Sequence, residues 1–382
     1  MNIPYGKQDI SIEDINSVVE VLRSDFLTQG PTIEIFENNI CNYVGGQFAV
    51  ATNSATSALH IACLALGLSE GDRLWTSPNS FVASANCGLY CGATIDFVDI
   101  DSQTYNMNPE LLEEKLIEAE KNNTLPKIVI PVNYAGQSCD LLKIKKLADK
   151  YKFYIIEDAS HSIGGMYRDK KIGSCYYSDI TVFSFHPVKI ITTGEGGISI
   201  TNNPILAEKM RILRSHGITR NINYMPITPD GDWHYQQIDL GFNYRMTDIH
   251  AILGCSQLKR IDQFVSRRNL IAKYYNERLQ NLPIVLPYQA PYNYSSFHLY
   301  PILLQKKDDR KRVFELLRAN RIGVNVHYIP IHTQPYYKNL GFKYGDFPNA
   351  EQFYSSTISL PIYYSLTEEE QEFVIKILSQ IL

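Results

Sequence analysis

The chain has 382 residues, of which 45% are hydrophobic, and a formal net charge of −4 at pH 7. That length exceeds one ordinary domain and supplies a sizeable apolar core, so we expect a large domain and a smaller one. The small net charge, without a dominant basic block, argues against a general nucleic-acid binder.

The cysteines and the N-terminus point to a reducing compartment. Seven cysteines are scattered from Cys41 to Cys255, a pattern that fits neither a disulfide framework nor a metal site. The N-terminus lacks the apolar core of a signal peptide, and no stretch approaches the roughly 20 apolar residues that span a bilayer. We therefore expect a cytoplasmic protein without a membrane segment or a bound metal.

Two helices are predicted first along the chain. After an extended arm that ends near Ile10, the segment 11–24 has a Ser11 cap followed by apolar residues at helical spacing. A second helix is expected to begin after Pro31 and to end at Gly45-Gly46.

Strand and helix signals then alternate as far as residue 159. The strand-like runs are QFAVATN, RLWTSP, TIDFVDI, KIVIPVNY and KFYIIEDAS, each followed by a helical pattern or a turn. This alternation is typical of a mostly parallel sheet flanked by helices, which is an α/β fold. Two more strands, DITVFSFH and GGISITN, enclose a glycine-rich turn.

The last third of the chain is more mixed. Residues 217–245 read as one long loop, and long loops in compact domains are usually functional or disordered. Beyond Met246 a long amphipathic helical stretch precedes two strand-like runs, FHLYPILLQ and RIGVNVHYIPI. We place the domain boundary near residue 250, which gives a large domain at 1–250 and a smaller α+β domain at 251–382.

The most informative segment is SFHPVKIITTGEGG at 184–197, which sets Lys189 between hydroxyl residues and a glycine-rich turn. Most lysines are simply solvated, and such a turn can merely join two strands. Two upstream segments change the interpretation, because EDASHSIGG places Asp158 after an apolar run and NSATSAL forms a hydroxyl-rich strand-to-helix turn. Together they indicate a pyridoxal phosphate site with an imine-forming lysine, an acid for the ring nitrogen and a cup for the phosphate. Lys189 would then have a lowered pKa and act as both nucleophile and proton carrier.

Three residues could face the cofactor ring. Asp158 emerges from a buried strand, where an unpaired carboxylate is costly, and a protonated pyridine nitrogen would supply its cation. An aspartate that caps a turn is the alternative. His161 could pack on the cofactor or be a satisfied structural histidine. Phe81, shortly after Pro78, could cover the other ring face or belong to the core.

The phosphate cup is predicted at the start of a helix. Asn53 ends a strand, and the amides of Ser54, Ala55 and Thr56 then point at one spot together with the positive helix end. An ordinary helix cap explains the same residues. Ser184 would add a hydroxyl, or it is only a strand serine. All these residues follow strand ends, where ligands bind in open α/β sheets.

Several motifs in the chain resemble one family. SFHPVKIITTGEGG, EDASHSIGG, NSATSAL, LTQGP and GFNYRMTDIHAILGCSQL are together similar to the DegT/DnrJ/EryC1/StrS nucleotide-sugar aminotransferases, over essentially the whole chain. The resemblance implies the type I, aspartate aminotransferase-like fold of pyridoxal-phosphate-dependent transferases. It also implies a homodimer whose active sites are shared across the interface.

The same resemblance implies roles for individual residues. Lys189 would form the Schiff base, Asp158 would meet the pyridine nitrogen, and Ala55, Thr56 and Ser184 would bind the phosphate. Asn243 of GFNYR would reach the phosphate of the neighbouring subunit. The nucleotide sugar would meet residues that are unremarkable from composition alone, namely Tyr5, Asp25, Phe26, Leu27, Thr28, His186, Asn325, Val326, His327 and Tyr328.

Within the family, the lysine motif and RSHG at 214–217 most resemble members of the pseudaminic acid pathway. This implies transfer of an amino group from glutamate to C4 of a UDP-4-keto-6-deoxy-N-acetylhexosamine. Pro187, Gly194 and the long insert 221–237 depart from relatives, so a sugar of the bacillosamine or legionaminic type stays as an alternative. Related sugar dehydratases lose the lysine or add an iron–sulfur cysteine cluster, whereas this chain keeps Lys189 and has no compact cluster. A non-catalytic binding protein of the same fold would have no use for the full catalytic set.

Overall fold

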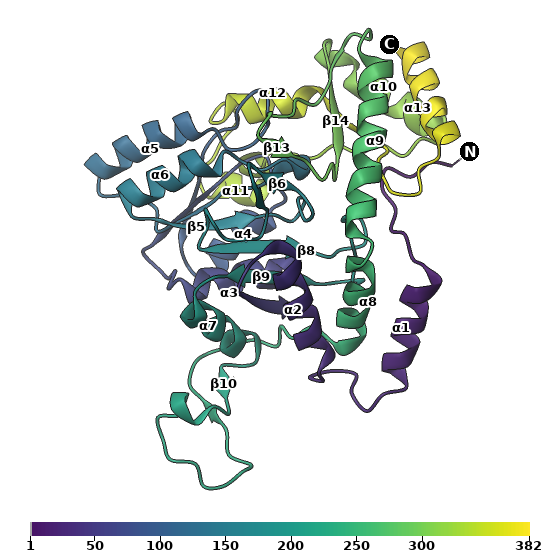
Figure 1. The fold of residues 1–382 in the computed structure, drawn as a ribbon. Coiled ribbons are helices and arrows are strands. Elements are labelled where there is room, and N and C mark those ends of the chain that lie inside the picture. The colour runs from purple at the N-terminus through teal and green to yellow at the C-terminus, as the bar shows by residue number, and fades with distance from the viewer. Residues whose placement is uncertain (1) are drawn as a thin grey trace.

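The computed structural model describes residues 2–382 and is built around a seven-stranded sheet of order β1-β9-β8-β5-β4-β2-β3 (Figure 1). Neighbours from β3 to β8 in this order run parallel, and β9 is antiparallel to both β8 and β1. The mostly parallel sheet and the α/β class are therefore confirmed. The strands span β1 Phe48–Thr52, β2 Arg73–Thr76, β3 Thr94–Phe97, β4 Ile128–Ile130, β5 Tyr154–Asp158, β8 Ile180–Ser184 and β9 Gly197–Thr201.

Helices cover both faces of this sheet. Successive strand side chains point to opposite faces, so Ile128 and Ile130 pack in the cluster of α3 and α4, and Val129 packs in the cluster of α5 and α6. Burial on both faces explains why the strands read as nearly continuous apolar runs. The helices of this part are α2 Thr32–Val44, α3 Ala55–Ala65, α4 Ala83–Tyr90, α5 Pro109–Lys121, α6 Leu141–Tyr151 and α7 Pro204–Arg214.

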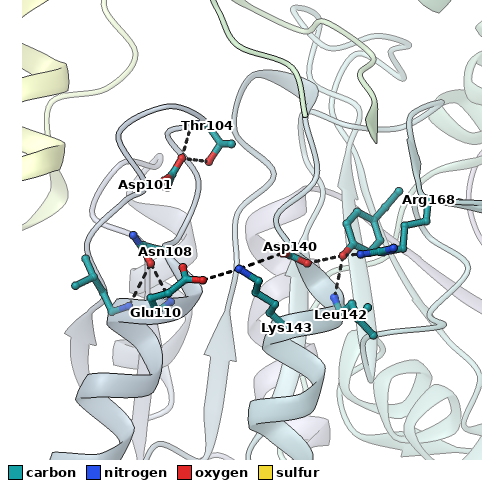
Figure 2. Close-up of polar contacts among 10 residues, drawn as sticks. Asp101, Thr104, Asn108, Glu110, Asp140, Leu142, Lys143 and Arg168 are labelled. Carbon is teal, nitrogen blue, oxygen red and sulfur yellow. Dashed lines mark hydrogen bonds and ion pairs between the residues drawn. The ribbon is translucent and has the colours of Figure 1, made fainter. Parts of the chain in front are cut away.

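A chain of polar contacts joins the N-terminal ends of α5 and α6 to the short strand β6, Met166–Tyr167 (Figure 2). Asn108 caps α5 by accepting from two amides of its first turn. Lys143 of α6 pairs with Glu110 of α5 at 2.5 Å, and the Tyr167 hydroxyl donates to Asp140 at 2.6 Å. Exposed ion pairs contribute little individually, so we read these contacts as fixing the relative placement of the two helices.

The N-terminal helix α1, Ile12–Leu22, begins with a capping box between Ser11 and Asp14 and packs against α8, Asp248–Leu258. Arg260 pairs with Asp9 and Asp14 at 2.6 Å and so ties this arm to the start of α9, Ile261–Leu279. Figure 1 shows α8 and α9 forming one long column beside the sheet. Both predicted N-terminal helices are thereby confirmed.

The C-terminal part has its own antiparallel sheet of order β12-β14-β15 and its own core cluster. Ile3 of the N-terminal arm is fully buried in that cluster. The division near residue 250 stays a prediction. The remaining elements are β7 Lys170–Lys171, β10 Ile218–Thr219, β11 Gln236–Gln237, β12 Ile284–Val285, β13 Asn293–Tyr294, β14 Tyr300–Leu304, α10 Arg310–Ala319, α11 Pro335–Asn339, α12 Pro348–Ser356, β15 Thr357–Leu360 and α13 Glu368–Ile381.

The prediction of a strand at RIGVNVHYIPI is wrong. This segment makes only isolated bridges, from Ile322 to Ile3 and from Asn325 to Ser359. Its backbone at Gly323 packs directly on the arm, where an added Cβ would lie 2.8 Å from the Tyr5 amide nitrogen. The segment touches the free edge of β15 only at Asn325 and then runs to Tyr328, whose hydroxyl meets His161 at the carboxyl edge of the large sheet.

The predicted long loop holds the β10–β11 hairpin, which projects from the body (Figure 1). No helix among residues 2–382 has the length and apolar character to cross a membrane. In the same described part, all seven cysteines are free and no three His, Cys, Asp or Glu side chains group as metal ligands.

Candidate active site

The candidate site lies at the carboxyl edge of the large sheet. β5 ends at Asp158, β8 ends at Ser184, and the turn after β8 contains Lys189. β1 ends at Thr52, one residue before the turn that opens α3. Three segments that are far apart in the sequence therefore converge, as the sequence motifs predicted.

Asp158 is buried and firmly oriented. One carboxylate oxygen accepts from the Ser84 hydroxyl at 2.6 Å, and the other accepts from the Ser160 hydroxyl at 2.6 Å and the Ser160 amide at 3.1 Å. No lysine, arginine or histidine among residues 2–382 forms an ion pair with it. A buried carboxylate that lacks a protein cation is costly, so this site suits a cationic ligand atom.

Lys189 has an amine that loses its proton readily. Burial lowers its pKa to about 8, although the negative charge of Asp158 opposes the shift. The amide of Lys189 donates to the His186 carbonyl at 2.9 Å, which places the lysine in a tight turn. A lysine with this pKa is neutral in a useful fraction of molecules near neutral pH and can attack a carbonyl carbon.

The start of α3 forms the predicted cup. The Ser54 hydroxyl accepts from the Ser57 amide at 3.1 Å and caps the helix, while the amides of Ala55 and Thr56 have no acceptor among residues 2–382. Gly197 of β9 passes so close that an added Cβ would lie 2.4 Å from the Ala55 nitrogen. Free amides at a helix N-terminus form a ready anion site.

A group of aromatic and imidazole rings, in which His161 is buried, borders the lysine. His161 Nε2 and the Tyr328 hydroxyl are 3.1 Å apart, and their rings stack at 6.1 Å. The Phe81 ring lies 6.4 Å from the Tyr328 ring and is 60% exposed. Burial and the positive charge of Lys189 lower the pKa of His161 well below its usual value. Tyr328 thus connects His161 with Phe81, the two residues predicted to face the cofactor ring.

Most of the other residues predicted to bind the substrate lie near Tyr328 or at the turn that contains Lys189. Tyr5 lies 5.5 Å ring to ring from His327, and the Asn325 amide is 3.4 Å from His327 Nε2, so these residues join the Tyr328 group. Val326 donates its amide to the Asn325 side chain at 2.8 Å, and His186 is exposed at the lysine turn.

The segment 25–28 is not part of that group. It is exposed and pairs with the start of α8, through a bridge from Thr28 to Thr247 and a bond from the Asp248 amide to Leu27. Asn243 has an exposed side chain, and its carbonyl lies 3.4 Å from the Asn53 amide group of the same chain. Within the single chain, Asn243 therefore lies beside the turn that opens α3, and the segment 25–28 lies beside the start of α8.

The residues present fit pyridoxal phosphate. The unpaired amides of Ala55 and Thr56 suit its phosphate, Asp158 suits a protonated ring nitrogen, and Lys189 suits its aldehyde carbon. His161 Nδ1 is buried without a hydrogen-bond partner among residues 2–382, so the imidazole is free to contact a bound ring.

Sequence reasoning missed several groups around this site. Ser84 comes from α4 and Ser296 donates to the His161 carbonyl at 2.7 Å, over separations of 74 and 135 residues. No local pattern marks a serine that acts across such a distance. A cavity of about 650 Å³ lies elsewhere, along the free edge of β1 between α2 and α7. Neither Lys189 nor Asp158 lines that cavity.

A half-buried lysine of lowered pKa near an oriented, buried carboxylate, with an anion cup on a mostly parallel sheet, defines the class of pyridoxal-phosphate-dependent aminotransferases with the type I fold. More particularly, the chain belongs to the DegT/DnrJ/EryC1/StrS aminotransferase family, whose model matches residues 8–379.

Individual relatives cover nearly the whole chain. It is 37% identical over 377 residues to the UDP-4-amino-4,6-dideoxy-N-acetyl-beta-L-altrosamine transaminase of Campylobacter jejuni subsp. jejuni, which covers 97% of this chain and 95% of the relative. The structure of this chain is similar to that of Helicobacter pylori PseC, an aminotransferase involved in the biosynthesis of pseudoaminic acid, with a TM-score of 0.92 and 32% sequence identity. The match covers 100% of this chain and 99% of PseC. The PLP form of the sugar aminotransferase Spr1654 from Streptococcus pneumoniae is also similar, with a TM-score of 0.90 and 29% sequence identity. That match covers 100% of this chain and 100% of the other.

Proposed function

We propose that this protein transfers an amino group from glutamate to C4 of a UDP-4-keto-6-deoxy-N-acetylhexosamine, as a step of pseudaminic acid biosynthesis. The observation that carries the aminotransferase chemistry is Lys189 with a pKa of about 8 beside the buried, oriented Asp158. The names of the Campylobacter and Helicobacter relatives support the choice of sugar.

Lys189 is the residue we assign to covalent attachment and proton transfer. Pyridoxal phosphate, when bound, supplies an electron sink for the carbanion that forms when a proton leaves the amino-bearing carbon. Because Lys189 Nζ is partly shielded from water and readily neutral, it can take that proton and return it to a neighbouring carbon. One amine of this pKa serves both directions of the transfer.

Asp158 keeps the ring nitrogen protonated in this proposal. Ser84 and Ser160 hold both carboxylate oxygens from the protein side, so the carboxylate cannot rotate away from its ligand. A fixed charge in a buried site acts without reorganisation, which is the main source of electrostatic catalysis. Ser54, Ala55, Thr56 and Ser184 would hold the phosphate, and His161 and Phe81 would face the ring.

The nucleotide sugar would enter past the Tyr328 group. Tyr5, Asn325, Val326, His327 and Tyr328 lie together beside His161, and burial with the nearby Lys189 lowers the pKa of His327 to about 3. A neutral imidazole and two tyrosines offer hydrogen bonds to sugar hydroxyls without adding charge. His186 lies at the turn of Lys189 and would also reach the sugar.

A second subunit would complete the site. The side chain of Asn243 is exposed beside Asn53, and the segment from Asp25 to Thr28 is exposed beside the start of α8, so a two-fold partner could meet both. We therefore propose a homodimer in which Asn243 binds the phosphate of the neighbouring subunit. Seven free cysteines agree with the cytoplasmic location we propose.

The test is product identification. The purified protein is incubated with pyridoxal phosphate, glutamate and a panel of UDP-4-keto sugars, and the products are identified by NMR. The proposal predicts amination at C4 of the pseudaminic acid precursor. Preference for a precursor of the bacillosamine or legionaminic type would replace the sugar assignment, and amination only at C3, or no turnover of any 4-ketosugar, would remove it.

A further inference from the structure

Behind His161 lies a second buried histidine, His298, to which the proposed function assigns no role. The two rings are 4.3 Å apart at 40°, and both residues are 5% exposed. His161 follows β5, and His298 lies just before β14 in the C-terminal part. Nδ1 of each ring is buried without a hydrogen-bond partner among residues 2–382. The pair therefore touches by ring packing rather than by a mutual hydrogen bond.

Arg268 of α9 holds the backbone at His298. It is 2% exposed, and its Nη1 donates to the carbonyls of Phe297, His298 and Ile362 at 3.1, 3.3 and 3.0 Å. Burial lowers its pKa to about 10, so the guanidinium is still charged at neutral pH. Among the described residues it forms no ion pair with a carboxylate. Taking a guanidinium out of water costs free energy, and here the three carbonyl acceptors offset that cost. The same hydrogen bonds fix the backbone at Phe297, His298 and Ile362.

The opposite side of the same segment is clamped by the turn at 134–136. The Ser296 amide donates to the Gly136 carbonyl and the Leu299 amide to the Ala135 carbonyl. A Cβ on Gly136, which has φ +106°, would lie 2.8 Å from the Phe297 nitrogen and 3.0 Å from the His298 nitrogen. This glycine is required both by its conformation and by the close approach. His298 is consequently fixed from two sides.

The contacts of His161 converge on the same segment. Its carbonyl accepts from the Ser296 hydroxyl at 2.7 Å, its Nε2 meets the Tyr328 hydroxyl, and one ring face meets His298. We propose that His298 is a positioning residue, whose clamped ring supports His161 from behind and sets the plane that His161 presents to the pyridine ring. The proposal rests on the assignment of His161 to the cofactor in the proposed function.

The surrounding charges keep this stack neutral. Burial is the main cause that lowers the pKa of His298 well below its usual value, and His161, Lys189, Arg268 and His327 add to the effect. Burial, Lys189 and His327 lower the pKa of His161 in the same direction. Two neutral imidazoles can pack at this tilt without charge repulsion. Loss of His298 would open space for water beside His161 and weaken this control.

The first test follows the cofactor ring, not turnover. In the His298→Ala holoenzyme, we expect the visible circular dichroism band of bound pyridoxal phosphate to lose at least about half its amplitude, because the ring loses its fixed asymmetric surroundings. His298→Phe keeps an aromatic ring and should restore the band. An unchanged band in His298→Ala, or an equal loss in both variants, overturns the proposal.

A second test uses the cofactor-free protein. Histidine NMR, with His161→Gln to assign the signal, should show His161 in the parent still neutral at acidic pH values where an ordinary histidine is charged, and its midpoint should move up in His298→Ala. His332→Ala is a matched control, since His332 is fully buried but contacts Glu351 and Phe347 instead. It should lower the melting temperature and leave the His161 signal and the dichroism unchanged. No change in the titration of His161 in His298→Ala contradicts the role.

The kinetic consequence separates positioning from sugar binding. In His298→Ala we expect kcat to fall by about tenfold to a hundredfold, the scale of small misplacements at a reacting centre, with KM for the sugar nearly constant. The half-reaction with glutamate should fall equally. A fall in activity that appears only as a raised KM overturns the proposal. Dichroism and NMR need no sugar, so an error in the proposed substrate leaves them readable.

Discussion

Asp158→Asn is the substitution whose result the structure specifies most closely. In the parent, Ser84 gives its one hydroxyl proton to a carboxylate oxygen, so in its 2.8 Å contact with the Ser80 hydroxyl it is Ser80 that donates. The asparagine amide can instead donate to Ser84, which then donates to Ser80. The bonds from Ser160 to the other oxygen are kept. We expect the variant to fold and to melt within a few degrees of the parent.

Its chemistry should fail for an electrostatic reason. A neutral amide cannot hold the ring nitrogen protonated, and loss of one preorganised group at a reacting centre costs about 3–4 kcal/mol. At about 1.4 kcal/mol per factor of ten, the rate should fall by roughly a hundredfold to a thousandfold. The assay is the single-turnover half-reaction with glutamate, followed by absorbance, alongside thermal melting.

Glu157→Gln provides the matched control. Glu157 is the neighbouring buried carboxyl of β5, but Asn133 and Thr181 bind it on the other side of the strand. Burial raises its pKa, so an uncharged glutamine is a close substitute. We expect activity near that of the parent. An Asp158→Asn variant within tenfold of the parent would refute the assignment of the acid.

Three further predictions address the amine, the cup and the subunit partner. The pKa of Lys189 is lowered to about 8, so the neutral fraction of this amine grows as pH rises through that value. The rate at which pyridoxal phosphate attaches to the cofactor-free protein should therefore increase about tenfold from pH 7 to pH 9 and then level off. A rate that keeps rising beyond about pH 10 would indicate a lysine whose pKa is not shifted. Gly197→Ala should weaken cofactor affinity by tenfold or more, because the added Cβ would press on the Ala55 nitrogen of the cup. Fluorescence titration measures this affinity, and an unchanged value would place the phosphate elsewhere. A heterodimer of a Lys189→Ala chain with an Asn243→Ala chain has one intact site if Asn243 acts in the neighbouring subunit, so it should recover up to roughly half of parental activity, provided Asn243→Ala alone is impaired. Tagged heterodimers without recovery would show that Asn243 does not act in the other subunit.

Sequence patterns captured those parts of the molecule that depend on local order. Asp158, Lys189 and the turn at Asn53 each follow a strand, and strands buried on both faces are recognisable as apolar runs. The chain direction of β9 gave no such signal, because an antiparallel strand in this sheet has the same composition as its parallel neighbours. The segment at 321–331 was wrongly predicted as a strand because its β-branched residues, Ile322 and Val324, are buried as in a strand. They are buried by packing, and the segment makes only isolated bridges.

The supporting groups of the site were not predictable in the same way. Ser84 bonds a residue 74 positions away, and Ser296 bonds one 135 positions away. The partners of Arg268 lie 29 to 94 positions away, so all three roles exist only in the folded chain. A lone serine or arginine in a helix gives no pattern that distinguishes this task from solvation. The position of Asn243 relative to a second subunit depends on an assembly that one chain does not specify.

The central claim is that Lys189 carries the cofactor. Borohydride reduction of the protein with bound pyridoxal phosphate, followed by peptide mapping, tests it most directly. The pyridoxyl group should be found on Lys189 alone, and Lys189→Ala should have no labelled peptide and no turnover. A label on another lysine, or near-normal activity in Lys189→Ala, would contradict the account.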